Sequence, residues 1–278
     1  RAITVCTPGA VRVAGFFNPE LRIDGRSVAF FGCFESRGTA AQDAAAFAHI
    51  ESWAKQHGAE QLYGPIDFST FGRYRLRLST ESGDALPFPG EPYNPSDYPD
   101  RLARLGFSIA QEYLTYVGSA TVAQLSLPAK RPIRDGLCAQ GFTFASLSHA
   151  EWLRRLPELH GMVDAIFAEN FAYTPLSDEA FARACGPSFI AKACPHTSVI
   201  ATAPDGTLAG FFLTFPHYGP LVNQDAGRDR VAVADLRFDP HGMALCATGQ
   251  ATALAKTVGV APAYRSVGLM DAMTVTTF

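Results

Sequence analysis

The sequence lacks an apolar run as long as the ~18 residues of a membrane-spanning helix, so we expect no transmembrane segment. It also lacks a basic excess. The 23 Lys and Arg stand against 26 Asp and Glu, and a net charge of −3 at pH 7 argues against a broad nucleic-acid-binding surface. We expect no signal peptide at the start, because residues 1–5 already resemble a strand. We therefore expect a cytoplasmic protein without nucleic-acid or membrane partners.

Paired cysteines are absent as well. The six cysteines show no C-x-x-C pair and no Cys/His ligand spacing; they are Cys6, Cys33, Cys138, Cys185, Cys194 and Cys246. We expect neither a metal site nor a disulfide scaffold, and we expect reduced thiols. Cys33 could carry an acyl group in a two-step mechanism, but a free cysteine inside an apolar strand usually serves packing.

The length of 278 residues suggests two domains or one large one, and we place a first domain at residues 1–117. Strands are expected at 2–6, 11–17, 27–34, 61–63, 73–78 and 109–117, and helices at 40–57 and 98–105. Residues 73–78 alternate strictly, so Arg73, Arg75 and Arg77 would share one strand face. A solvated edge is the simpler interpretation of that face, and a contact with a phosphate or an acidic partner is the functional one.

Residues 118–141 contain prolines and a small basic cluster, Lys130, Arg131 and Arg134, and we interpret them as a solvated linker. The second domain is expected at residues 142–278. Its predicted elements are a strand at 142–146, a helix capped by Ser148, a helical segment from Pro157, a helix at 178–185, a hairpin of strands 199–203 and 208–215, and a strand at 254–260.

A tight turn, a glycine and a helix follow the last of these strands. Leu254–Val260 is apolar, Ala261-Pro262-Ala263 turns the chain, and a helix is expected to open at Arg265. The first N–H groups of a helix have no partner inside it and point at whatever lies there. Such a turn is therefore a ready anion site, and phosphate is its natural occupant.

This stretch resembles the acyl-CoA-binding motif of the GNAT acetyltransferase superfamily. That motif is a strand ending in V-x-P, followed by R/Q-x-x-G-x-G/A and a helix. Val260-Ala261-Pro262 and Arg265-Ser266-Val267-Gly268 match it. Met270 departs from it, because the motif has a small residue there that lets the cofactor lie close to the helix.

The first half resembles part of one domain in a family of tandem GNAT proteins. Three motifs carry this resemblance, F-F-G-x-F-E at 30–35, G-P-x-x-x-S at 64–69 and P-Y-N-P at 92–95. Residues 170–181 resemble the matching region of the same family. Ser36-Arg37-Gly38-Thr39 stands where a phosphate loop would be, so the first domain is expected to lack one.

The resemblance implies an α/β fold with two GNAT-like domains, each a twisted mixed sheet flanked by helices and each incomplete in this sequence. The first half starts without the family's opening strand and helices, and the second stops at Phe278, before the closing strands. We expect that residues are missing at both ends, rather than that the two halves complement each other.

The implied activity is acyl transfer from acetyl-CoA or another acyl-CoA to a small-molecule amine or similar nucleophile. Two alternatives stay open. One is the same chemistry on the phosphopantetheine thioester of an acyl-carrier protein in natural-product biosynthesis, which Met270 motivates because a carrier-bound arm brings no nucleotide pyrophosphate. The other is a non-catalytic protein that binds a thioester or a partner.

The resemblance also suggests which residues act. Val258 and Val260 would pair with the pantetheine arm, and the pyrophosphate would lie against Arg265, Ser266, Val267, Gly268, Leu269 and Met270. Candidates for the general base are Glu35 at a strand end, His217 after the hairpin strand and His241 in a turn before the motif strand. The family's general acid would lie beyond Phe278.

Overall fold

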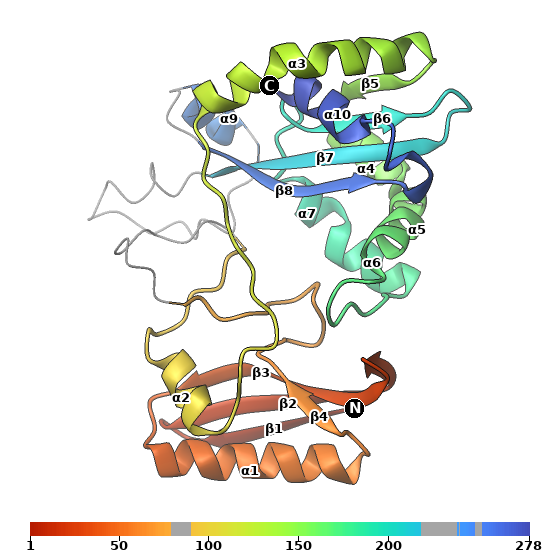
Figure 1. Cartoon of the computed structure of the whole chain (residues 1–278). Helices are drawn as coiled ribbons and strands as arrows, with labels where there is room; N and C mark the ends of the chain where they lie inside the picture. Colours follow the sequence, from red (N-terminus) through yellow and green to blue (C-terminus); the bar gives the residue numbers. More distant parts are fainter. Residues whose placement is uncertain (79–89, 218–237, 239, 248–251) are drawn as a thin grey trace. The chain divides into compact units, whose positions relative to one another are not determined.

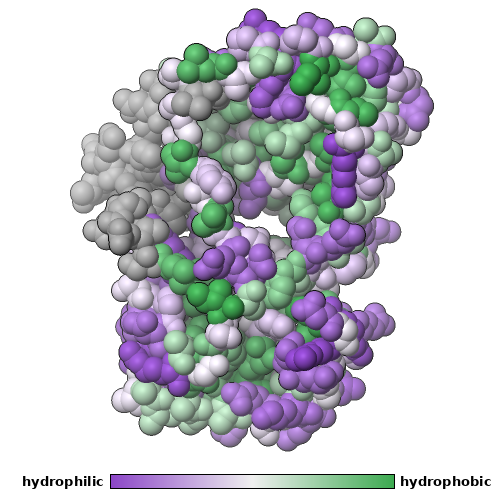
Figure 2. Space-filling model, in the orientation of Figure 1, coloured by the Kyte–Doolittle hydropathy of each residue, from purple (hydrophilic) through white to green (hydrophobic). Residues whose placement is uncertain are grey.

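The chain forms two compact units, each with its own sheet and helices (Figure 1). The computed structural model describes residues 1–78, 90–217, 238, 240–247 and 252–278. Unit 1 comprises Arg1–Leu114 and Glu169–Thr174, and unit 2 comprises Thr115–Ala168 and Pro175–Phe278. Hydrophobic and hydrophilic residues are interspersed on the visible face of both units (Figure 2).

Within the described ranges, every helix is too short or too polar to pass through a lipid bilayer.

Unit 1 is a mixed sheet with a long helix on one face. Its strands lie in the order β1 (Ala2–Thr7), β2 (Val11–Ile23), β3 (Arg26–Ser36) and β4 (Gln61–Tyr63). The first three pair antiparallel, and β4 runs parallel to the start of β3. Helix α1 (Ala40–Gln56) begins with a capping box of Thr39 and Gln42.

The apolar stripe of α1 explains why it covers this sheet. Phe47 and Ile50, which recur at helical spacing, are buried in one cluster with Val13 of β2 and Phe31 of β3. The short helix α2 (Tyr98–Arg104) adds Tyr98 to the same cluster. One face of the first sheet is thus sealed by α1.

Unit 2 is a four-stranded sheet that is antiparallel between all its described strands, in the order β5 (Thr143–Ser146), β6 (Val199–Thr202), β7 (Leu208–His217) and β8 (Thr252–Val260). Its helical segments are α3 (Ala120–Ala139), α4 (His149–Arg154), α5 (Leu156–Phe167), α6 (Asp178–Cys185), α7 (Pro187–Ile190), α9 (Pro240–Ala247), the 3₁₀ turn η2 (Pro262–Tyr264) and α10 (Leu269–Thr277).

Neighbouring residues of β7 face opposite layers of helices, because side chains alternate along a strand. Phe212 lies in a cluster with Leu137 of α3 and Met273 of α10. Phe211 instead meets Trp152 of α4, with ring centroids 5.7 Å apart. Helices α3 and α10 therefore cover one face of the sheet, and α4 lies on the other.

Several sequence predictions are wrong in the fold. Residues 73–78 and 109–117, expected as strands, show only an isolated bridge between Ile66 and Tyr74. Arg75 has a φ of 78°, which breaks the expected alternation, so Arg73, Arg75 and Arg77 do not share a strand face. The second sheet is antiparallel rather than mixed in its described part.

Residues 118–141, expected as a linker, contain helix α3. Pro128 and Pro132 lie inside this helix, and each removes a helical hydrogen bond, so local propensity argues against it. Leu127 and Leu137 are buried, and α3 packs along α10. The helix forms because tertiary packing of its apolar side outweighs the two prolines.

Candidate functional site

The outer edge of β8 carries backbone groups that the sheet does not use. β8 ends the strand order in the described part of unit 2, so only its β7 side is paired there. The Ala261 N–H donates to the Ala209 carbonyl at 2.9 Å, and the register continues unbroken through Gly259 to Val258. Hydrogen-bonded and non-hydrogen-bonded pairs alternate in an antiparallel ladder. The N–H and C=O groups of Val258 and Val260 therefore point away from β7.

A bulge interrupts β8 at Lys256. Leu213 pairs with Thr257 and Thr214 pairs with Ala255, which leaves Lys256 as an extra residue. Bulges bend a strand, leave backbone groups outside the ladder and often lie beside active sites. At the ~3.3 Å rise of a strand, this one lies about 13 Å before the last residue of β8.

The chain leaves β8 through η2 and enters α10 at Gly268. Gly268 caps the helix in the left-handed region, with φ 83° and ψ 20°. The helix thus begins at Leu269 and not at the expected Arg265. Arg265 and Ser266 are exposed, whereas Leu269 is 1% exposed with its backbone included, so Leu269 offers almost no surface to a ligand.

The first turn of α10 contains N–H groups that have no carbonyl partner within the helix, and of its residues Met270 and Asp271 have exposed surface. The Ala272 N–H makes the first helical bond, to the Gly268 carbonyl at 3.1 Å, so residues 269–271 have no carbonyl partner within the helix. Such groups attract an anion. Asp271 opposes this, because its carboxylate lies in the same turn, but Lys130 of α3 pairs with it at 2.8 Å.

Glycine at position 268 has a structural reason besides anion binding. A Cβ there would lie 2.7 Å from Cγ2 of Ile133 on α3, and its φ favours glycine. Lys130 and Arg134, expected as solvated linker charges, bind Asp271 and Thr276 of α10. Packing of α3 against α10 is therefore sufficient to require a small residue at 268.

The three candidate bases belong to three different elements, one in unit 1 and two in unit 2. Glu35 lies in unit 1 and forms an exposed cross-strand ion pair with Arg12 at 2.8 Å, as a solvated strand-end carboxylate does. His217 ends β7, opposite Thr252 at the start of β8. His241 lies in the first turn of α9 rather than in a loop, and its side chain is outside the described part of the structure.

His217 has the protonation state that a base requires. Burial lowers the pKa of His217 below its usual value, so the imidazole is neutral at pH 7 and can accept a proton. It lies at the opposite end of β8 from the turn before α10. Of the three candidates, His217 alone belongs to a strand that pairs with β8.

Cys33 is a poor nucleophile in this structure. Burial, together with the neighbouring Asp67 carboxylate, raises the pKa of the Cys33 thiol. The thiolate is the reactive form of cysteine, and both effects disfavour it. The two-step mechanism through Cys33 therefore has no support from the geometry.

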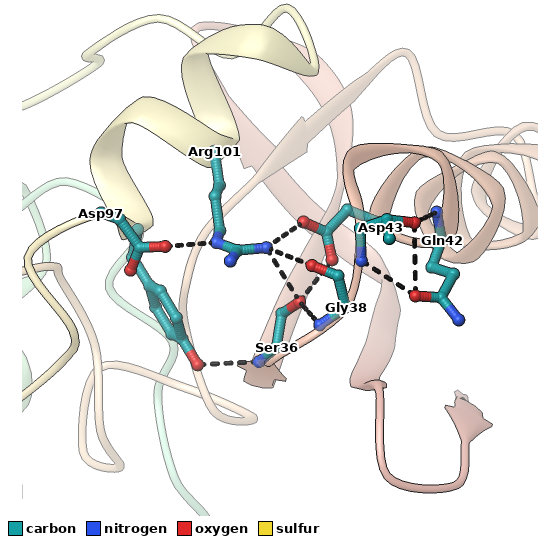
Figure 3. Close-up of polar contacts among 8 residues, drawn as sticks. Ser36, Gly38, Gln42, Asp43, Asp97 and Arg101 are labelled. Atoms are coloured by element: carbon teal, nitrogen blue, oxygen red, sulfur yellow. Dashed lines mark hydrogen bonds and ion pairs between the residues drawn. The ribbon is translucent and has the colours of Figure 1, made fainter.

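Unit 1 has the same local order of strand, loop and helix, but its own side chains occupy the corresponding place. After β3, the loop at Ser36–Thr39 leads into α1, and Asp43 in the first turn of α1 is buried (Figure 3). Arg101 of α2 reaches this turn and donates from Nη1 to Asp43 at 2.8 Å and to the Gly38 carbonyl at 2.8 Å. An ion pair between a buried carboxylate and a partly exposed guanidinium thus occupies this helix N-terminus, where a phosphate would bind.

The side of β3 that faces away from β2 is filled as well, beyond the residues that pair with β4. Its backbone groups bond to Ile66, to the Asp67 carboxylate and to the Tyr98 hydroxyl, at 2.7, 2.6 and 2.8 Å respectively. A Cβ at Gly32 would lie 2.5 Å from the Asp67 carboxylate. There is no room along this edge for a bound arm. The contrast with β8 is the main asymmetry between the two units.

Sequence reasoning missed the bulge at Lys256 and the position of α3. Nothing in residues 252–260 alone indicates a bulge, because it depends on the pairing with β7. The only hint of α3 in the sequence was a few apolar residues, among them Leu127 and Leu137, which the structure buries. Among the described residues, no group of three His, Cys, Asp or Glu is placed to hold a metal ion.

Comparisons with known proteins give no family. No protein-family model and no curated protein matches the chain. One similar solved structure is a GCN5-related glucosamine N-acetyltransferase region in a fungal multi-domain GH3 β-N-acetylglucosaminidase, with 10% identity and a TM-score of 0.39. The match covers 96% of this chain and 27% of that chain. A likeness at this level assigns neither fold nor function.

The buried ion pair of unit 1 yields a stability prediction. Arg101→Met should lower the free energy of unfolding by about 3 kcal/mol, because it leaves the Asp43 carboxylate buried without its cation. Arg104→Met on the same helix is the control, since Arg104 is exposed. Urea unfolding followed by tryptophan fluorescence measures both, with Trp53 reporting on unit 1. Equal losses in the two variants would show that Arg101 does not hold this turn.

Gly268 can be tested for its two possible roles with a double mutant. Gly268→Ala should cost about 1–2 kcal/mol from the left-handed backbone alone, with a further loss from the contact with Ile133. Adding Ile133→Ala to Gly268→Ala should restore only the stability that was lost through the contact with Ile133. If the turn binds phosphate, CoA affinity by calorimetry stays low in the double mutant. Full recovery of both stability and CoA affinity would assign Gly268 to helix packing and not to an anion site.

Proposed function

We propose that unit 2 binds an acyl thioester along the outer edge of β8 and transfers its acyl group to a small-molecule amine or similar nucleophile, as GNAT-type acyltransferases do. The observation that carries the proposal is the outward direction of the backbone groups of Val258 and Val260, in line with the turn before α10. The order of helices, hairpin, strand, turn and helix in unit 2 also agrees with the GNAT pattern.

The pantetheine arm of CoA fits such an edge because it is extended and contains amide groups. An extended ligand can add to a sheet edge as a further strand, with backbone hydrogen bonds supplying the affinity. With the pyrophosphate at the turn formed by Arg265–Met270, the arm would run back along Val260 and Val258. The thioester would then lie toward the bulge at Lys256, which is where β8 departs from its ladder.

The chemistry requires one proton acceptor and one proton donor. The amine lone pair attacks the thioester carbonyl carbon, the C–S bond breaks, the amine proton passes to a base, and the sulfur receives a proton. His217 is the proposed base, since it is neutral and lies at the far end of β7 from the phosphate turn. Backbone N–H groups near the bulge could hold the developing oxyanion.

Unit 1 is proposed as a partner domain without a donor site. Its β3 edge is occupied by Ile66, Asp67 and Tyr98, and Arg101 occupies the N-terminal turn of α1. One acyl donor per chain is therefore expected. The third function considered, a non-catalytic thioester-binding protein, would use the same edge of β8 and differ only in lacking turnover.

An acyl-carrier protein as donor is the second candidate. Asp271 favours it, because a carboxylate in the first turn of α10 suits a nucleotide pyrophosphate poorly. Met270, 54% exposed in the same turn, adds bulk there. Arg73, Arg75 and Arg77 do not form a basic strand face for an acidic carrier. Arg75 instead contacts Glu91 and the rings of Tyr74 and Tyr113. Lys130 balances Asp271, so acyl-CoA remains our preferred donor.

A proline at position 258 tests the edge directly. Val258→Pro removes an N–H that faces away from β7, so the sheet should tolerate it as edge strands tolerate proline. Acetyl-CoA affinity by calorimetry should fall about fivefold, because one hydrogen bond contributes roughly 1 kcal/mol.

Val258→Ala is the matched control for that experiment, because it keeps the N–H and removes the side chain. We expect it to bind acetyl-CoA within about twofold of the wild type, a difference well under 1 kcal/mol. Equal weakening by alanine and proline, or no acetyl-CoA binding by the wild type, would overturn the assignment of the arm to this edge. Release of CoA thiol with an amine panel then separates an enzyme from a binding protein.

A further inference from the structure

Unit 1 contains a cavity of about 340 Å³ on the face of its sheet opposite α1. Its walls include Phe16 of β2 and Val28 and Phe30 of β3, which belong to a different cluster from the residues that α1 covers. Phe68 also lines the cavity, Asn18 and Thr174 add polar groups, and Arg1 adds a positive charge. The lining is thus aromatic and apolar, with a small polar part.

Phe68 is an unusual residue in this lining. It is 70% exposed, and its φ of 66° lies in the left-handed region that disfavours a bulky side chain. Its ring centroid lies 4.3 Å from that of Phe16. Strained backbone of this kind is found at ligand clamps and persists only where the surroundings enforce it.

The loop that carries Phe68 is held firmly at its base. The Cys33 N–H donates to the Asp67 carboxylate at 2.6 Å, and the Asp67 N–H donates to the Arg73 carbonyl at 2.7 Å. Gly32 lets the loop lie directly on β3, since a Cβ there would meet Asp67. Phe68 is therefore presented at the cavity by a fixed loop.

We propose that this cavity binds a flat aromatic group of one or two fused rings with a polar substituent. Its volume is about twice the ~150 Å³ of an apolar protein cavity that takes up benzene. Phenylalanine rings offer edge-to-face and offset-stacked contacts that favour an aromatic guest over an aliphatic one of equal size. The site lies wholly in unit 1 and does not depend on the acyltransferase proposal.

Indole is the probe for the first test, titrated into the full chain by calorimetry and ligand-observed NMR. We expect a dissociation constant at or below about 1 mM, and at least about fivefold weaker binding to Phe68→Gly. The same variant should raise the urea midpoint of unfolding, because glycine adopts a φ of 66° without strain. Higher stability with weaker binding is not expected if Phe68 serves only the fold.

Tyr93→Gly is the matched control, since Tyr93 is another exposed aromatic residue of unit 1, at 79%, and is not part of the cavity lining. It should leave indole binding unchanged. Thr174→Trp should abolish binding by placing a ring in the cavity. The proposal is overturned if indole binds no more tightly than about 10 mM, if Phe68→Gly binds like the wild type, or if cyclohexylmethanol binds as tightly as indole.

Discussion

Each unit of the protein must satisfy the backbone hydrogen bonds along the outer side of one of its strands. Buried or covered N–H and C=O groups need partners. In unit 1 the edge of β3 is completed by Ile66, the Asp67 carboxylate and the Tyr98 hydroxyl. In unit 2 the edge of β8 is not paired within the described residues, and the backbone groups of Val258 and Val260 point outward from it. The same local order of strand, loop and helix thus has an occupied strand edge in unit 1 and an unpaired one in the described part of unit 2.

The same contrast holds at the helix that follows each strand. In unit 1 a buried carboxylate and guanidinium, Asp43 and Arg101, occupy the first turn of α1. In unit 2 the first turn of α10 has Asp271 tied to Lys130 by an ion pair at its surface. A phosphate could approach the first turn of α10. At the first turn of α1 it would have to displace the ion pair between Asp43 and Arg101. This is why one donor site per chain is the simplest interpretation of the geometry.

The sequence was sufficient where structure is set by local signals. The strand Gln61–Tyr63 and the helix Asp178–Cys185 with its Ser177 cap are confirmed with their expected bounds, because periodicity and capping are read within a few residues. Residues 73–78 also alternate, yet pairing needs a partner strand that the sequence cannot supply. Helix α3 was not predicted because its two prolines argue against a helix when the segment is considered alone. The packing against α10 that stabilises it is not visible in the sequence. For the site, the sequence located β8 and its turn, but the outward direction of Val258 and Val260 depends on the register with β7.

Amide hydrogen exchange read by NMR, with and without saturating acetyl-CoA, tests the central claim most directly. We expect slower exchange on ligand addition at the amides of Val258 and Val260 and of Met270 and Asp271, because these are the backbone groups that the ligand would cover. Exchange at Cys33, whose N–H is already bonded to Asp67, should not change. Protection along β3 instead of β8, or no change at Val258 and Val260 under saturating ligand, would contradict it.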